Sequence, residues 1–213
     1  MIRPMSELFH HAAEIMSKGV PVMWVLLGVS IVSLTLTFER VLFWLSLNGS
    51  GRRARIDKIT EKLRSGDLAG AKNLADQDQS LYGAVAEALL VGRITDSTAI
   101  GLVERHRPSL ERFNTALSTI VTGSPLVGLL GTVTGIIRSF DLIGNASAVR
   151  DIPAVAQGVS EALLNTAGGL GVALFTLIPY VIFKGMADRG LGTIEVMVAA
   201  AEQGRAAAPA AKA

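Results

Sequence analysis

A single carboxylate, that of Glu161, lies within a long apolar part of the chain. Between Ile152 and Phe183 no other side chain is charged. Because an ionisable group is costly inside a bilayer, a carboxylate kept there indicates a functional site. Such a group can attract cations and exchange protons with the outside. Glu161 is therefore a candidate for the mouth of an ion pathway.

Two threonines are predicted to lie at one depth in the membrane. Thr132 lies about 9 Å of helix before Arg138, the charge that ends its apolar run, and Thr166 lies about 7.5 Å beyond Glu161. Their hydroxyls donate and accept hydrogen bonds, so with water they can line a proton path or orient a carboxylate. They cannot store a proton at neutral pH. The sequence therefore predicts a partner subunit that supplies an acidic group.

Small and hydroxyl-bearing residues recur every three or four positions along both apolar runs, on one helical face. One interpretation of such a stripe is tight helix packing alone, and the other is a pore wall. Two stripes in one chain favour a shared pore. The candidates for pore lining or helix packing are Thr122, Pro125, Gly128, Gly135, Ala162, Gly169, Ala173 and Thr176.

Composition points to a bilayer and argues against several other classes. Of 213 residues, 50% are apolar and 18% are charged, and the net charge of +2 is too small to indicate nucleic-acid binding. The absence of cysteine excludes disulfides and thiolate metal sites. The three histidines, His10, His11 and His106, lie outside every apolar run. An intramembrane enzyme is therefore disfavoured, and no metal or organic cofactor is expected.

The fold class expected is an all-α membrane protein with three transmembrane helices, the later two extended into a cytoplasmic helical collar. We expect a periplasmic or interfacial amphipathic segment at 1–18, a first span at 19–47, a cytoplasmic helical domain at 48–112 and a second span at 113–140. A periplasmic loop at 141–152, a third span at 153–184 and a cytoplasmic helix with a disordered tail at 185–213 complete the chain.

Basic residues set the expected orientation. Six lysines and arginines follow the first span between Arg52 and Arg64, which places that side in the cytoplasm and both the amino terminus and the loop at 141–152 outside. Within the cytoplasmic part, helices are predicted over 56–63, 68–75 and 81–91 and from 98 onward. A glycine-rich turn is expected at 190–192 and a disordered tail at 206–213. Trp24 and Trp44 are predicted to lie at the two membrane interfaces.

Five stretches resemble the MotA/TolQ/ExbB proton channel family, most closely its TolQ/ExbB branch. They are GVPVMWVLL from Gly19, FERVLF from Phe38, GDLAGA from Gly66, SPLVGLLGTVTGII from Ser124 and GVSEALLNTAGGL from Gly158. The last two are the most specific. Together these stretches extend over about residues 19–184.

The resemblance implies a multi-pass protein of the bacterial inner membrane. In this family such subunits form a ring, commonly of five copies, around a dimer of a TolR/ExbD-like single-span partner whose aspartate carries the proton. The resemblance assigns Thr132 and Thr166 as the pore threonines that face this aspartate, and Glu161 as the acid at the head of the third span. H⁺ is the coupling ion it implies, with Na⁺ left open.

The sequence leaves two candidate functions. The first is an ion-driven stator subunit that converts proton-motive force into mechanical work on envelope proteins or transport. The alternative is a membrane scaffold whose small residues pack helices without ion conduction. A scaffold has no need of a buried acid, so Glu161 favours the first.

Overall fold

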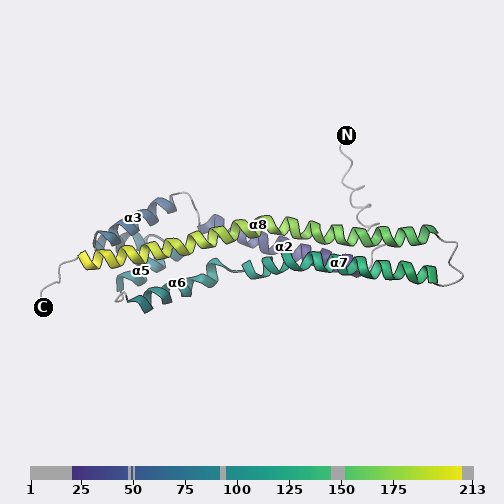
Figure 1. Cartoon of the computed structure of the whole chain (residues 1–213). Helices are drawn as coiled ribbons and strands as arrows, with labels where there is room; N and C mark the ends of the chain where they lie inside the picture. The colour runs from purple at the N-terminus through teal and green to yellow at the C-terminus, as the bar shows by residue number, and fades with distance from the viewer. Residues whose placement is uncertain (1–20, 48, 50, 92–94, 145–151, 208–213) are drawn as a thin grey trace, which may run out of the picture. The chain divides into compact units, whose positions relative to one another are not determined.

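In the computed structural model, the structure is described for residues 21–47, 49, 51–91, 95–144 and 152–207. Within these ranges the regular secondary structure is entirely α-helical (Figure 1). The helices are α2 (Pro21–Leu47), α3 (Arg52–Arg64), α4 (Leu68–Asp76), α5 (Leu81–Val91), α6 (Asp96–Leu110), α7 (Asn114–Gly144) and α8 (Ile152–Ala207).

Three of these helices are long and apolar enough to cross a membrane. They contain the segments Pro21–Leu47, Asn114–Asp141 and Pro153–Ala207. The prediction of an all-α chain with three spans is confirmed in these terms. The predicted amphipathic segment at 1–18, most of the loop at 141–152 and the last six residues of the tail lie outside the described residues.

The chain divides into two compact units. Unit 1 consists of Met1–Thr37 and Thr115–Val181, and unit 2 of Phe38–Asn114 and Ile182–Ala213. Helices α2 and α8 contribute to both units.

In unit 1, the first half of α2 packs on α8. Ser33 and Thr176 share a hydrogen bond of 2.7 Å between their hydroxyls, and both side chains are buried. Leu26 is also buried, and a β-carbon on Gly168 would lie 3.6 Å from its Cδ1. Polar and apolar side chains thus both take part in this contact.

The exposed surface of unit 1 is strongly apolar. Large apolar side chains stand exposed along all three helices, and Phe175 is 80% exposed. Soluble monomers rarely expose so continuous an apolar surface, whereas lipid or neighbouring chains would cover it. Examples are Trp24, Ile31, Leu126, Leu130, Leu174 and Ile178.

In unit 2, side chains cap the starts of α4 and α6. The Asp67 carboxylate accepts a hydrogen bond of 2.9 Å from the Gly70 N–H and caps α4. Hydrogen bonds from Lys62 and from this N–H lower the pKa of Asp67. Thr95 forms a capping box with Thr98 at the start of α6. The predicted helices of this region are thus confirmed, within a few residues at their ends.

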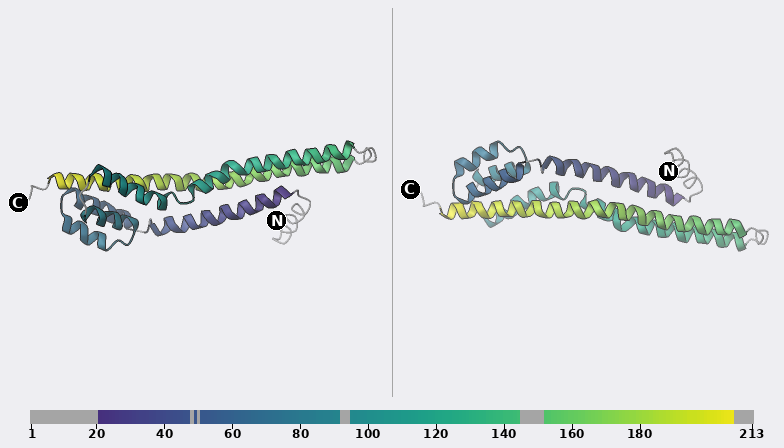
Figure 2. Two further views of the ribbon diagram at one scale, coloured as in Figure 1. Left: turned by 90° about the horizontal axis from the view of Figure 1, so that it is seen from below. Right: turned by 90° about the horizontal axis from the view of Figure 1, so that it is seen from above.

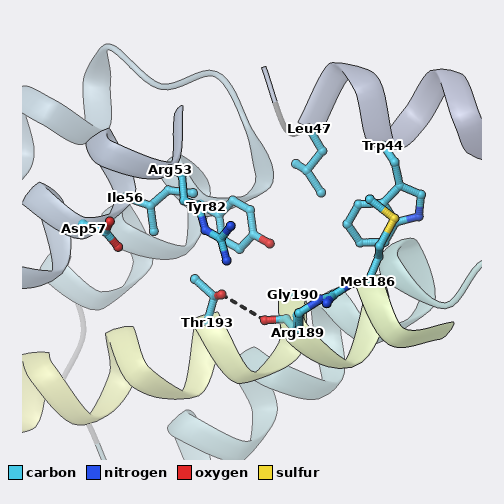
Figure 3. A pocket seen from close by; sticks show the side chains of 10 residues that line it. All are labelled: Trp44, Leu47, Arg53, Ile56, Asp57, Tyr82, Met186, Arg189, Gly190 and Thr193. Atoms are coloured by element: carbon cyan, nitrogen blue, oxygen red, sulfur yellow. Dashed lines mark hydrogen bonds between the residues drawn. The ribbon is translucent and has the colours of Figure 1, made fainter. Parts of the chain in front are cut away.

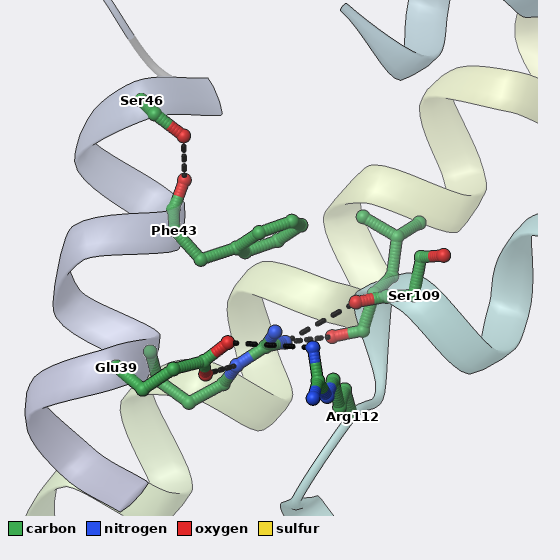
Figure 4. Close-up of polar contacts among 7 residues, drawn as sticks. Glu39, Phe43, Ser46, Ser109 and Arg112 are labelled. Atoms are coloured by element: carbon green, nitrogen blue, oxygen red, sulfur yellow. Dashed lines mark hydrogen bonds and ion pairs between the residues drawn. The ribbon is translucent and has the colours of Figure 1, made fainter. Parts of the chain in front are cut away.

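A buried cation ties α2 to the end of α6. Arg40 is 1% exposed, and its Nη1 donates to the carbonyls of Ser109 at 3.2 Å and Leu110 at 3.3 Å (Figure 4). Its Nε donates to Glu39 at 3.0 Å, and its guanidinium lies 4.3 Å from the centre of the Phe43 ring. A positive charge at the carboxyl end of a helix also interacts favourably with the helix dipole.

The expected turn at 190–192 is wrong, since α8 runs unbroken to Ala207. Gly190 serves packing instead of turning, because a β-carbon there would lie 3.2 Å from both Leu110 Cδ1 and the Tyr82 hydroxyl. The predicted tail also starts too early, since Ala206 and Ala207 belong to α8. Trp44 is buried at 4% exposure, whereas Trp24 is 58% exposed. The membrane depth of both tryptophans stays a prediction.

We expect Arg40→Gln to destabilise the protein by about 1–3 kcal/mol, because the buried carbonyls at the end of α6 lose their donors. The thermal unfolding midpoint of the purified protein measures this. Lys58→Gln is the matched control, since Lys58 is exposed. Equal midpoints for the two variants would show that Arg40 does not anchor α6.

Candidate functional site

The structure brings Thr132 of α7 and Thr166 of α8 into direct hydrogen-bond contact through their hydroxyls. The Thr166 hydroxyl also lies within hydrogen-bond distance of the Gly128 carbonyl at 3.2 Å, and that of Thr132 reaches the Ala162 carbonyl at 3.2 Å. Both side chains are half-buried, so part of each stays accessible. The predicted shared layer is therefore a physical contact between the two helices.

Glycines make this contact possible by letting the two backbones approach. Figure 2 shows α7 running alongside the first part of α8 in both views. A β-carbon on Gly128 would lie 2.7 Å from the Asn165 carbonyl oxygen, and one on Gly169 would lie 2.5 Å from that of Ser124. Any larger residue at either glycine would push the helices apart. Close approach through small residues is the usual way for helices to associate in lipid.

The same antiparallel register continues away from the threonines. A β-carbon on Gly135 would lie 2.7 Å from the Ala162 β-carbon, and one on Gly158 would lie 2.4 Å from the Ser139 hydroxyl. The small residues of one helix thus face those of the other along several turns.

Glu161 lies on α8, five residues before Thr166. It is half-buried and accepts a hydrogen bond of 3.0 Å from the Gln157 side-chain amide. Gln157 precedes Glu161 by one helical turn, so both lie on the same face of the helix. The carboxylate is reachable and held by a neutral donor.

Comparison with known proteins identifies the family. Residues 101–196 match the model of the MotA/TolQ/ExbB proton channel family. An ExbB-like biopolymer transport protein of Synechocystis sp. is 34% identical over 178 residues, which are 80% of this chain and 83% of the relative. The chain belongs to the MotA/TolQ/ExbB proton channel family.

Two further relatives differ in length from this chain. A second ExbB-like protein of Synechocystis sp. is 33% identical over 76% of this chain and 66% of the relative. The biopolymer transport protein ExbB of Pseudomonas putida is 32% identical over 73% of this chain and 53% of its own length. The chain thus spans about half of the latter protein.

Membership in the MotA/TolQ/ExbB family, together with the three apolar helices, makes the chain a multi-pass membrane protein. The family is one of channel proteins and not of enzymes. Among the described residues no three His, Cys, Asp or Glu side chains gather as a metal site would require.

Six of the eight other predicted residues pack helices together, and Thr122 and Pro125 are described separately. Gly128, Gly135, Ala162 and Gly169 pack α7 against α8. Thr176 bonds Ser33 of α2, and Ala173 is buried on the same helix. Thr122 is exposed, and its hydroxyl bonds the carbonyls of Ser118 and Thr119 in its own helix. Pro125 is half-buried within α7.

Asn165 was missed by sequence reasoning. It is 1% exposed, and its amide nitrogen has no hydrogen-bond partner among the described residues. A β-carbon on Gly131 of α7 would lie 2.6 Å from the Asn165 β-carbon, so this glycine makes room for the amide. The one sign in the sequence was a polar amide within an apolar run, between Leu164 and Thr166. The sequence alone does not tell a buried amide from an exposed one.

We expect Gly128→Ala to destabilise the protein by about 1–3 kcal/mol, because the new methyl group meets backbone atoms that cannot move aside easily. Thermal unfolding of the purified protein is the measurement. Gly171→Ala is the control on the facing helix, since a β-carbon there meets nothing within 4 Å. If Gly128→Ala is as stable as Gly171→Ala, the glycine contact does not set the helix spacing.

Proposed function

We propose that this chain is an ion-driven stator subunit of the bacterial inner membrane. Five copies form a ring around a dimer of a TolR/ExbD-like single-span partner. Protons that pass the partner's aspartate drive relative rotation, and this rotation does mechanical work on envelope proteins or transport. H⁺ is the coupling ion, and Na⁺ is the alternative.

The hydroxyl pair of Thr132 and Thr166 is the observation that carries this proposal. The two hydroxyls meet at one level of the pair formed by α7 and α8, and each side chain stays half-accessible. Hydroxyls in this position can accept or donate to a carboxylate or a water but cannot hold a proton themselves. In this proposal, a second protein supplies the group that holds the proton at the level of the two hydroxyls.

Glu161 also supports an ion pathway through this region. Its half-buried carboxylate lies on the helix that carries Thr166, about 7.5 Å along the axis. There it raises the local concentration of cations at the entrance to the hydroxyl layer. The names of the relatives, which mention biopolymer transport, support transport across the envelope as the work performed.

The second candidate, a membrane scaffold, is favoured by the glycine contacts between α7 and α8. Gly128 and Gly169 pack helices closely, which a scaffold also needs. The two functions differ in what the threonine hydroxyls do. A scaffold tolerates a threonine replaced by an isosteric apolar residue, whereas an ion pathway does not.

We expect Thr166→Val to lower proton flux by about tenfold or more, because valine keeps the shape of threonine but removes the hydroxyl. Flux is measured with a pH-sensitive dye in proteoliposomes that hold the chain and a co-purified, aspartate-bearing single-span partner. Thr166→Ser should retain most of the flux. Exchanging the imposed H⁺ gradient for a Na⁺ gradient identifies the coupling ion.

Thr134→Val is the control, because among the described residues the Thr134 hydroxyl bonds the Leu130 and Gly131 carbonyls of its own helix and no others. Normal flux in Thr166→Val would reject the ion pathway and favour the scaffold.

We expect Glu161→Gln to reduce proton flux at low salt concentration. Glu161→Asp should reduce it less, because aspartate keeps the negative charge at the entrance and glutamine does not. The same proteoliposomes measure this over a range of salt concentrations. Flux equal to that of the unmodified chain in both variants would remove Glu161 from the pathway.

A further inference from the structure

Unit 2 contains a cavity that none of the functions above uses. It has a volume of about 580 Å³, a size typical of small-ligand sites. Figure 3 shows the side chains that line it: those of α2 and α3 and that of Tyr82 face residues of α8. The lining residues are Trp44, Leu47, Ile56, Tyr82, Arg53, Asp57, Met186, Arg189, Gly190 and Thr193.

The cavity joins an apolar floor to a positive rim. Trp44, Leu47 and Ile56 are buried, whereas the side chains of Arg53 and Arg189 are exposed. Asp57 is the only acid among the lining residues, so the formal charge of the lining is +1. A ligand with an anionic head and an apolar body would match this division.

Among the described residues, the two arginines of the rim lack partners, unlike other arginines in the same unit. Arg52 pairs with Asp78 at 3.6 Å, and Arg55 donates to the Gln77 carbonyl at 3.1 Å. Within the part of the chain that the structure describes, no hydrogen bond or ion pair engages the guanidinium of Arg53 or Arg189. Their ten N–H donors are free for a ligand.

Neutral donors complete the lining. Burial raises the pKa of Tyr82, which stays a neutral hydroxyl at physiological pH. In Figure 3 its hydroxyl and the Arg53 guanidinium extend toward the same space. Thr193 adds a second hydroxyl, which donates to the Arg189 carbonyl at 2.9 Å and can still accept.

We infer that this cavity binds a phosphate group, and that an anionic phospholipid headgroup is its principal source. Guanidinium groups bind phosphate oxygens through paired, charge-assisted hydrogen bonds. The cavity begins at Leu47, the last residue of a candidate membrane span, so lipid headgroups are near at hand. Basic pockets at the cytoplasmic ends of spans suit such headgroups. The inference does not depend on ion conduction.

The test uses the full-length chain with Trp24→Phe, which leaves Trp44 in the cavity wall as the sole tryptophan. The protein in non-ionic detergent is titrated with phosphatidylglycerol, phosphatidylcholine or inorganic phosphate. Trp44 fluorescence follows binding, and the intact mass of the complex counts bound lipid. We expect saturable phosphatidylglycerol binding, about tenfold tighter than that of phosphatidylcholine.

The double variant Arg53→Gln/Arg189→Gln should weaken phosphatidylglycerol binding about tenfold. The matched control Lys58→Gln/Lys72→Gln removes the same charge from residues outside the cavity and should bind within about twofold of the parent. Phosphate that binds alone, with the same dependence on the two arginines, would support the site but make a free anion its ligand. Equal binding of both lipids, unchanged binding in the cavity variant, or no binding of phosphatidylglycerol or phosphate would overturn the inference.

Discussion

The close approach of α7 and α8 is the constraint on which the candidate site depends. In lipid, polar groups must find partners within the protein. Thr122 and Thr134 find them in the carbonyls of their own helix. Thr132 and Thr166 instead reach across to each other and to the facing carbonyls, which is possible only where glycines bring the two backbones together. The close glycine packing that a scaffold would use is thus also what allows the two threonine hydroxyls to meet.

Unit 2 is held by a different kind of interaction. Its core is apolar around residues such as Ile59 and Ile194, but its most deeply buried charge is Arg40, which binds the carbonyls that end α6. Phe113, three residues after this end, has a φ of 65°, a conformation that a bulky residue rarely adopts. The chain reaches α7 through this strained residue. The Arg40 guanidinium lies 5.8 Å from the centre of the Phe113 ring.

Much of the fold could be predicted from the uncharged runs of the sequence. The features that could not be predicted depend on contacts between residues far apart in the sequence. The carboxyl-terminal end of α2 was readable because the glycines after Leu47 end its apolar run. The layer of Thr132 and Thr166 was readable because helical rise converts residue number into depth. The turn predicted at Gly190 was wrong, because a glycine can mark either a turn or a close contact between helices. The anchoring role of Arg40 was missed because its partners are backbone carbonyls 69 and 70 residues away.

Disulfide cross-linking tests the central claim most directly, because the chain has no cysteine of its own. Thr166→Cys would be paired with a cysteine in place of the aspartate in the span of the co-purified partner, and oxidised in the membrane. Leu174→Cys, on the same helix and 60% exposed, is the control. The account predicts a cross-linked heterodimer for Thr166→Cys and little product for Leu174→Cys. Equal cross-linking at the two positions, or more at Leu174→Cys, would contradict it.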